Sequence, residues 1–236
     1  MAGHSKWANI KHKKAKVDAK RGKIFSRIVK EIISAVKVGG PDPKTNPRLR
    51  LVVQKAKAAN MSQETIEKNI KKASDPDQSS FEEMTYELYG HGGVGLLVDI
   101  LTDNKNRIAS DMRIATNKRG GSIGAPGSVA FNFDRKGLIE VEKNKAIEEE
   151  LFNLAIESGA EDFESSDRFI ILTDPSDLHK VEEALGAAGI EVASAEVGVM
   201  PKASVECSTE DREKNEALIE WLEELDDVSE VHHNMA

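Results

Sequence analysis

The pattern of apolar residues changes near residues 74–80, and this change constrains the fold more than any other feature of the sequence. Before it, apolar side chains recur every three or four residues, which is typical of helices that bury one face. After it, short apolar strands alternate with helical segments, as in proteins that pack helices on a sheet. The segment Ser74–Ser80 is rich in Ser, Asp and Pro and indicates a linker. We therefore expect a helical domain followed by α/β structure.

Three helices are expected before the linker. The first spans about Lys16 to Val36 and ends at Gly39-Gly40-Pro41, where glycine and proline interrupt a helix. The second starts near Pro47, and the third starts at Ser62. The apolar residues expected on their buried faces are Ile24, Phe25, Ile28, Val29, Ile32, Ile33, Val36, Leu49, Val52, Val53, Ala56, Ile66 and Ile70.

Strands and helices alternate after the linker. Strands are expected at residues 82–89, 94–102 and 128–133, with a helix at 104–118 and a flexible loop at 120–127. The next elements are strand 138–141, helix 146–158, strands 162–164 and 169–173, helix 176–188 and strand 191–199. This βαββαβ order is typical of ferredoxin-like domains. A weak strand around Cys207, a helix at 210–225 and a strand at 228–232 complete the set.

The elements after Lys202 are too few to form a domain alone, so we expect them to complete the unit that starts at Phe81. The predicted fold class is α+β, with an N-terminal three-helix domain followed by two α/β (ferredoxin-like) domains, one inserted in the other. The expected boundaries are 1–78 for the basic helical domain, 79–134 plus 203–236 for the split α/β domain, and 135–202 for the inserted βαββαβ domain.

Charge is distributed unevenly along the chain. Residues 1–75 hold 19 Lys and Arg against 6 Asp and Glu, whereas residues 76–236 hold 14 against 35. The net charge of −8 conceals this division. Such asymmetry is typical of a nucleic-acid-binding arm attached to an acidic body.

The arm itself is the strongest candidate for a binding site. Residues 1–30 contain ten Lys and Arg and one acid, Asp18. Because cations at this density repel one another, a polyanion is the expected partner, and Trp7 is placed to stack on a base. The alternative is a solvated tail that Trp7 anchors to the helices. The predicted nucleic-acid-binding residues are Lys6, Trp7, Lys11, His12, Lys13, Lys14, Lys16, Lys20, Arg21, Lys23, Arg27, Arg48, Arg50, Lys105 and Arg107.

Two groups in that set have competing structural interpretations. Arg48 and Arg50 follow Pro47, and packing at the start of a helix explains their positions as well as a nucleic-acid contact does. Lys105 and Arg107 belong to the one basic cluster of the acidic body. A solvated helix face explains their positions as well as a nucleic-acid contact does. The other members of that cluster are Arg113, Lys118 and Arg119.

Other chemistry is not expected. The segment Gly90–Gly95 matches G-x-G-x-x-G, but a strand follows it rather than the helix that a dinucleotide site needs, so we interpret it as a turn. The six histidines and the single cysteine, Cys207, lack metal-ligand spacing, and one cysteine forms no intramolecular disulfide. We predict no catalytic residues, metal, cofactor, small-molecule substrate or membrane segment, and a cytoplasmic location.

The sequence resembles the YebC/PmpR family. The resemblance rests on the opening string Met1–Lys14, on Asp18–Lys23 and Asp42–Arg50, and continues through Tyr86–Gly95, Thr102–Arg107 and Gly127–Phe131. It implies a helical N-terminal domain and two α/β domains, one inserted into the other. It also implies a non-enzymatic regulator: members are described as DNA-binding transcriptional regulators, and others as ribosome-associated factors that help translation of proline-rich stretches.

The leading interpretation is thus a non-enzymatic, nucleic-acid-binding regulator of gene expression, of the DNA-binding transcriptional type. The alternative within this class is a factor that binds ribosomal RNA, which a basic arm with one tryptophan and no base-reading helix favours. A protein-interaction scaffold is a second class, and an enzyme a third for which no pocket of acid–base groups is indicated. Oligomeric state and target sequence do not follow from the sequence.

Overall fold

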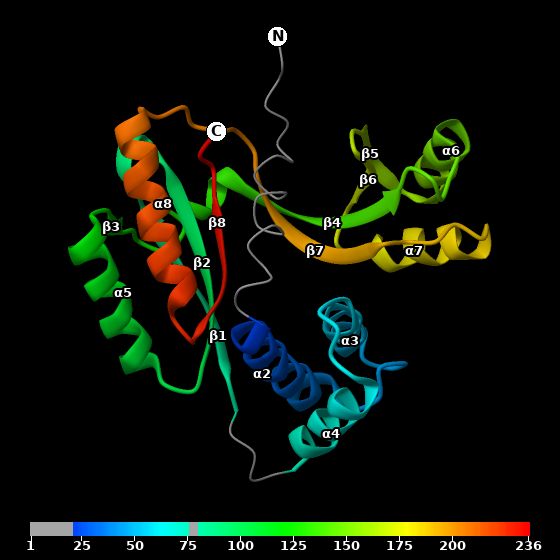
Figure 1. Ribbon diagram of the computed structural model, residues 1–236, viewed down its shortest axis with the longest axis horizontal. Helices are drawn as coiled ribbons and strands as arrows, with labels where there is room; N and C mark the ends of the chain where they lie inside the picture. Colours follow the sequence, from blue (N-terminus) through cyan, green and yellow to red (C-terminus); the bar gives the residue numbers. More distant parts are fainter. Residues whose placement is uncertain (1–20, 76–79) are drawn as a thin grey trace. The chain divides into compact units, whose positions relative to one another are not determined.

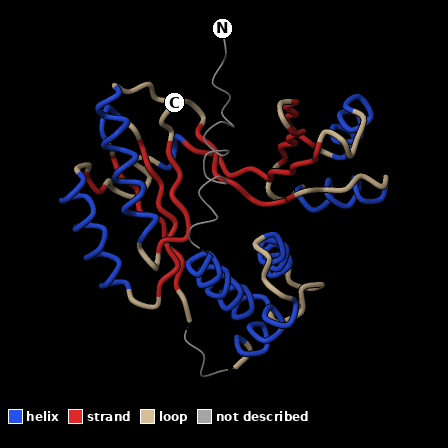
Figure 2. The backbone as a smooth tube through the Cα atoms, viewed as in Figure 1, coloured by secondary structure: helices blue, strands red, loops and turns tan. Residues whose placement is uncertain are grey.

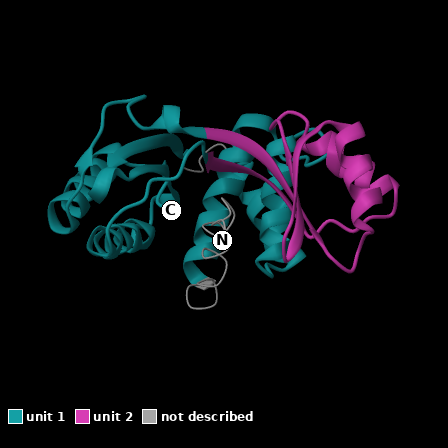
Figure 3. Ribbon diagram, turned by 90° about the horizontal axis from the view of Figure 1, so that it is seen from above, with its two compact units in different colours: residues 1–133, 201–236 teal, residues 134–200 magenta. Residues whose placement is uncertain are grey.

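The computed structural model describes residues 21–75 and 80–236. These residues form two compact units, shown in different colours in Figure 3. Unit 2 is Asp134–Met200, and unit 1 contains the chain before and after it. Unit 1 thus contains the helices before the linker as well as the split sheet.

Within residues 21–75, helices joined by loops make up the structure (Figure 2). These are α2 (Arg21–Gly39), α3 (Pro47–Ala58) and α4 (Gln63–Ala73). Local side chains fix two of the starts, because Asn46 accepts the N–H of Leu49 and Ser62 accepts that of Thr65. The first helix was predicted from about Lys16, and its first five residues, to Lys20, lie outside the described residues. Its end lies three residues later than expected.

The three helices share one apolar core, as their periodicity predicted. Ile28, Ile32 and Leu49 are fully buried, because each lies on the inner face of its helix. The full buried cluster is Ile28, Ile32, Ile33, Ala35, Val36, Leu49, Val52, Ala56, Met61, Ile66 and Ala73. Of the expected core residues, Ile24, Phe25, Val29, Val53 and Ile70 are only partly buried and pack against this cluster.

The split sheet has the strand order β3-β1-β2-β8. Strands β1 (Glu82–Tyr89) and β2 (Gly95–Thr102) form an antiparallel hairpin around a short 3₁₀ turn at His91–Gly93. The C-terminal strand β8 (Val228–His233) pairs antiparallel with β2, so the last strand of the chain lies beside the second. Helices α5 (Lys105–Arg119) and α8 (Thr209–Glu224) cover one face of this sheet.

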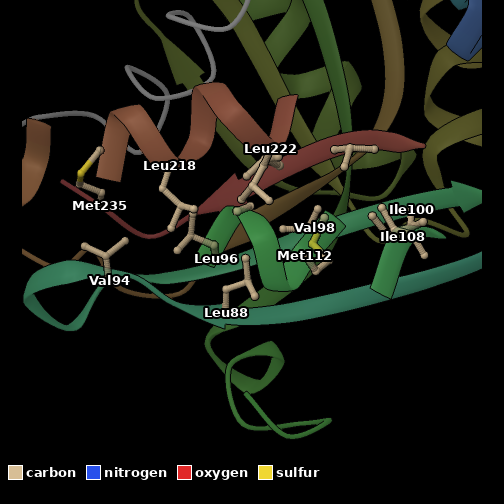
Figure 4. Packing of buried hydrophobic residues seen from close by; sticks show 13 residues of the cluster. Leu88, Val94, Leu96, Val98, Ile100, Ile108, Met112, Leu218, Leu222 and Met235 are labelled. Atoms are coloured by element: carbon tan, nitrogen blue, oxygen red, sulfur yellow. The ribbon is translucent and has the colours of Figure 1, made fainter. Parts of the chain in front are cut away.

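The core beneath these two helices is aliphatic (Figure 4). Alternate residues of β2, among them Leu96, Val98 and Ile100, point toward Met112 of α5 and Leu222 of α8. This alternation is the period of a strand with one face on a helix layer. The sheet therefore positions α8 so that its C-terminal end lies beside the start of β8.

Unit 2 has the predicted βαββαβ order. Its elements are β4 (Phe133–Glu142), α6 (Glu148–Ser158), β5 (Ala160–Ser165), β6 (Arg168–Thr173), α7 (Leu178–Ala187) and β7 (Ser194–Pro201). The sheet order is β5-β6-β4-β7, with β6 antiparallel to both β4 and β5. Together with the N-terminal helices, these two sheets confirm the predicted α+β fold class.

Three local predictions were wrong. Residues 128–133 were expected to be a strand, but Ala130–Asn132 form a 3₁₀ turn and β4 starts only at Phe133. The loop expected at 120–127 contains the short strand β3 (Ser122–Ile123), which pairs with β1. Cys207 lies outside any strand, because only Val205 forms a bridge there, with Met235.

A buried carboxylate explains the first of these differences. Glu87 on β1 is 9% exposed and accepts the backbone N–H groups of Gly127, Val129 and Ala130, the last two at 2.6 and 2.7 Å. Groups bonded to a side chain are not available to a neighbouring strand. Burial raises the pKa of Glu87, but the three N–H donors outweigh it and hold the pKa below its ordinary value.

We expect Glu87→Gln to lower the free energy of unfolding by about 2 kcal/mol at neutral pH, because the amide replaces a charged acceptor of three N–H groups. A carboxyl with a lowered pKa stabilises the fold above its unfolded pKa and loses this effect as pH falls through its folded pKa. The difference between wild type and variant should therefore shrink below about pH 4. Urea unfolding followed by circular dichroism across this range tests it, with the exposed Glu82→Gln as control; a difference that does not change with pH would contradict the assignment.

Candidate nucleic-acid interface

Most of the predicted arm lies outside the described residues. This applies to Lys6, Trp7, Lys11, His12, Lys13, Lys14, Lys16 and Lys20. Arg21 is described only as the first residue of α2. The remaining predicted residues, in α2, at the start of α3 and at the start of α5, are all described.

Hydrogen bonds join cations of α2 to the C-terminal end of α8; both helices are labelled in Figure 1. Lys23 donates to the carbonyl of Glu224, and Arg27 donates to the carbonyl of Glu223. Lys30, one turn further along the same face, donates to the carbonyl of Asp226 at 2.9 Å and to the carboxylate of Asp227 at 2.8 Å. Lys23, Arg27 and Lys30 therefore contact another part of unit 1.

This contact has a simple electrostatic cause. The last carbonyls of a helix have no partner within the helix and carry partial negative charge. Lys23 and Arg27 supply donors and positive charge to two of those carbonyls at the end of α8. The acidic run from Glu223 to Asp227 adds formal negative charge at the same place.

Asp227 is the centre of this junction. Its side chain is almost fully buried, and three different elements donate to it. Besides Lys30, the donors are the hydroxyl of Thr102 at 2.9 Å and the guanidinium of Arg107, at 2.9 Å from Nε and 2.6 Å from Nη2. Burial raises the pKa of Asp227, but the bonds from Lys30, Arg107 and Thr102 outweigh it and lower the pKa below its ordinary value.

The cations at the start of α5 also have partners within the chain. Arg107 bonds to Asp103 at 2.7 Å as well as to Asp227, and these bonds raise its pKa further. Lys105 pairs with Glu82 at 2.5 Å on the surface. At the other end of α5, Arg119 lies over the ring of Trp221, 5.1 Å from its centre. The basic cluster of the body is thus spread along α5, with its first members paired to acids.

At the start of α3, Arg48 pairs with Glu83 of β1, and Arg50 donates to the carbonyls of Pro43 at 3.2 Å and Lys44 at 3.1 Å. Asn46 at this helix start is buried and donates to the carbonyls of Ala35 and Gly40. These contacts agree with the interpretation that Arg48 and Arg50 pack the start of a helix. A phosphate that engaged Arg48 would have to replace Glu83.

The described predicted cations therefore do not form a single free surface. Lys23, Arg27, Arg48, Arg50, Lys105 and Arg107 each hold an intramolecular acceptor. Sequence reasoning missed Asp227 and the role of the α8 terminus. The available signal was the acidic run Glu223–Asp227 directly after a helix, which is a natural partner for a row of cations.

Two further searches cover the described ranges only. Within residues 21–75 and 80–236, no group of three His, Cys, Asp or Glu side chains is arranged to hold a metal ion. None of the helices in those ranges is long and apolar enough to cross a membrane.

We expect Asp227→Asn to lower the free energy of unfolding by about 3 kcal/mol, because it leaves Lys30 and Arg107 partly desolvated without their shared anion. Asp226→Asn removes the same charge from the exposed neighbouring residue and should change stability by less than about 0.5 kcal/mol. Urea unfolding of both variants measures the difference. Equal stability of the two would show that the junction at Asp227 does not hold the fold together.

Comparison with known proteins follows the same domain order. The chain matches the N-terminal domain of TACO1/YebC proteins over residues 5–76, and their second and third domains over residues 81–235. A relative from Protochlamydia amoebophila, named a probable transcriptional regulatory protein, is 66% identical over 236 residues, which cover 100% of this chain and 96% of the relative. A relative of the same description from Chlamydia felis is 58% identical, with 100% of both chains covered.

A solved structure is similar as well. The crystal structure of a conserved hypothetical protein from Aquifex aeolicus matches with a TM-score of 0.85 and 46% sequence identity, covering 98% of this chain and 97% of the other. The matches to both domain descriptions and to full-length relatives confirm the resemblance predicted from the sequence motifs. The chain belongs to the TACO1/YebC family.

Proposed function

We propose that this protein is a non-enzymatic regulator of gene expression that binds nucleic acid through its basic N-terminal arm, with duplex DNA as the first candidate ligand. The observation that carries the proposal is the charge of residues 1–30, where ten Lys and Arg accompany one acid. The relatives from Protochlamydia and Chlamydia, named probable transcriptional regulatory proteins, support the regulatory role.

The physical argument concerns counterions. A nucleic acid holds condensed cations along its phosphates, and Lys and Arg side chains that neutralise those phosphates release the cations, which raises the entropy. The contacts are made to phosphates, which give affinity and position but no base specificity. Trp7 adds one aromatic ring, which suits stacking on an unpaired base more than reading a duplex. This feature favours ribosomal RNA, and binding to the ribosome as a translation factor is the alternative function.

The acidic body restricts where the nucleic acid lies. Residues 76–236 carry 35 acidic against 14 basic side chains, so they repel phosphates along most of their surface. We therefore expect the main contact at the arm, upstream of the junction between α2 and α8. In this proposal the binding residues are Lys6, Trp7, Lys11, His12, Lys13, Lys14, Lys16, Lys20 and Arg21.

Lys23 and Arg27 have a different place in the proposal. Both were predicted as phosphate contacts, yet their donors already meet carbonyls at the end of α8. A phosphate would need to displace those carbonyls. We therefore expect Lys23 and Arg27 to support the arm by holding α2 in place. The secondary phosphate contacts in the proposal are Arg48, Arg50, Lys105 and Arg107. Each of these would exchange its present acid or carbonyl partner for a phosphate.

A salt series tests the main contact. Replacing Lys11, Lys13 and Lys14 by Ala should weaken binding to duplex DNA and lower the slope of log affinity against log salt by about 2.7, since each lost phosphate contact removes about 0.9. The matched control replaces Lys68, Lys71 and Lys72, three exposed lysines of α4, and should leave the slope nearly unchanged. Equal slopes for the wild type and the arm variant would remove the arm from the binding site.

The same series with purified ribosomes separates the two ligands. Binding to promoter duplex that is tight and sequence-selective at physiological salt supports the transcriptional role. Tight binding to ribosomes beside weak, unselective binding to DNA supports the translational alternative instead.

A second variant tests the role of Lys23 and Arg27. Replacing both by Ala should reduce the free energy of unfolding and leave the salt slope for nucleic acid unchanged, because their acceptors are carbonyls of α8. Urea unfolding and the DNA titration are measured on the same preparation. A slope lowered by about 1.8, with stability unaffected, would instead return both residues to the phosphate-binding set.

A further inference from the structure

Unit 2 exposes three large apolar side chains around one helix. Ile147, directly before α6, is 64% exposed, and Phe152 and Ile156 on α6 are 44% and 42% exposed. Phe152 and Ile156 are four residues apart and thus lie on the same face of the helix, one turn from each other. The neighbouring face of the helix, with Leu151 and Ala155, is fully buried. The helix therefore has apolar residues on both its inner and its outer side.

The outer apolar residues are held rigidly. Phe152 packs edge-on against Phe163 of β5, with ring centres 5.5 Å apart and an angle of 86°. Phe163 packs in turn on Phe169 of β6, at 5.7 Å, and Phe169 is 2% exposed. A continuous row of rings thus connects the surface to the core of unit 2. Such a fixed aromatic floor loses little side-chain entropy when a partner covers it.

A hollow of about 570 Å³ opens on this floor. Its lining residues are Glu148, Glu149, Phe152, Phe163 and Ser165, so apolar rings form the base and carboxylates the rim. Lys143 also reaches the rim, where it pairs with Glu148 at 3.5 Å and donates to Ser165. The volume lies within the range of about 300–1,000 Å³ that is usual for binding pockets.

The charge around the hollow selects the chemistry of an occupant. Glu149, Glu150 and Glu157 of α6 are exposed, and residues 134–200 together hold 17 acidic against six basic side chains. Acids in the first turn stabilise a helix, but that role does not require exposed apolar residues beside them. A phosphate would be repelled here, whereas a cationic segment would be attracted.

We propose that this hollow, which we call the α6 groove, is a docking site for a lysine- or arginine-rich segment of a partner protein that inserts one bulky apolar side chain against Phe152 and Phe163. The cations of the segment pair with Glu149 at the rim and with the exposed Glu150 beside it, and its apolar side chain completes the burial of Phe152. The site lies in unit 2 and does not depend on the proposed function.

The test uses a fluorescein-labelled synthetic peptide that has four lysines around one tryptophan, titrated into the full chain at low salt and followed by anisotropy. Phe152→Ser should weaken binding at least tenfold, because buried aromatic anchors carry most of the affinity of such contacts. Ile114→Ser on α5, which truncates an apolar residue of similar exposure, is the matched control and should stay within twofold.

The rim is tested by Glu149→Lys/Glu150→Lys, which retains every apolar residue and should also weaken binding about tenfold. The control Glu182→Lys/Glu183→Lys makes the same charge change on α7 of the same unit and should have an effect of less than threefold. Circular dichroism verifies that each variant is folded.

Four results would overturn the proposal. The first is no binding of the peptide to the wild type, and the second is equal binding to all variants, which would indicate general charge attraction only. The third is a wild type that self-associates through this face and becomes monomeric in Phe152→Ser, since the occupant would then be a second copy and not a separate partner. A peptide with Ala in place of Trp should bind at least tenfold more weakly; equal affinity would also reject the apolar insertion.

Discussion

The buried carboxylate of Asp227 is the interaction on which the arrangement of unit 1 depends. It lies directly after α8 and before β8, and it receives donors from α2, β2 and α5. A buried charge without partners is very costly, so these elements must dock together when α8 and β8 take their places. The ends of α2 and α8 meet for the same reason, and the N-terminal helices become part of the unit that contains the split sheet. Asp227, near the C-terminus, therefore fixes the basic helix α2 against the rest of unit 1.

The positive charge of the N-terminal region has two roles. Part of the positive charge, at Lys23, Arg27 and Lys30, neutralises the negative end of α8. The other seven Lys and Arg of residues 1–30 are the part proposed to meet a polyanion. The surplus of acids in unit 2 surrounds an apolar groove, which suits a protein contact and disfavours a phosphate one. The two proposed surfaces thus differ in charge and in chemistry.

Predictions from the sequence succeeded where the cause of a structure is local. Asn46 and Ser62 cap the helices that follow them, and the apolar period of residues 24–36 matched the buried face of α2. They failed where a distant residue decides. Glu87, about forty residues earlier in the chain, takes the N–H groups that a strand at 128–133 would have needed. The same holds for the candidate site. Its cations were predicted from the sequence, whereas the acceptors that they contact were not.

The sequence by itself determined the family, the order of the elements and the concentration of cations in the first thirty residues, because motifs, periodicity and charge are properties of short segments. Tertiary structure decided which cations are already neutralised and which apolar residues stay exposed. Lys30 and Asp227 are almost two hundred residues apart, and Phe152 meets Phe163 only because α6 packs beside β5. Contacts of this kind depend on how whole elements pack, and no local pattern encodes them.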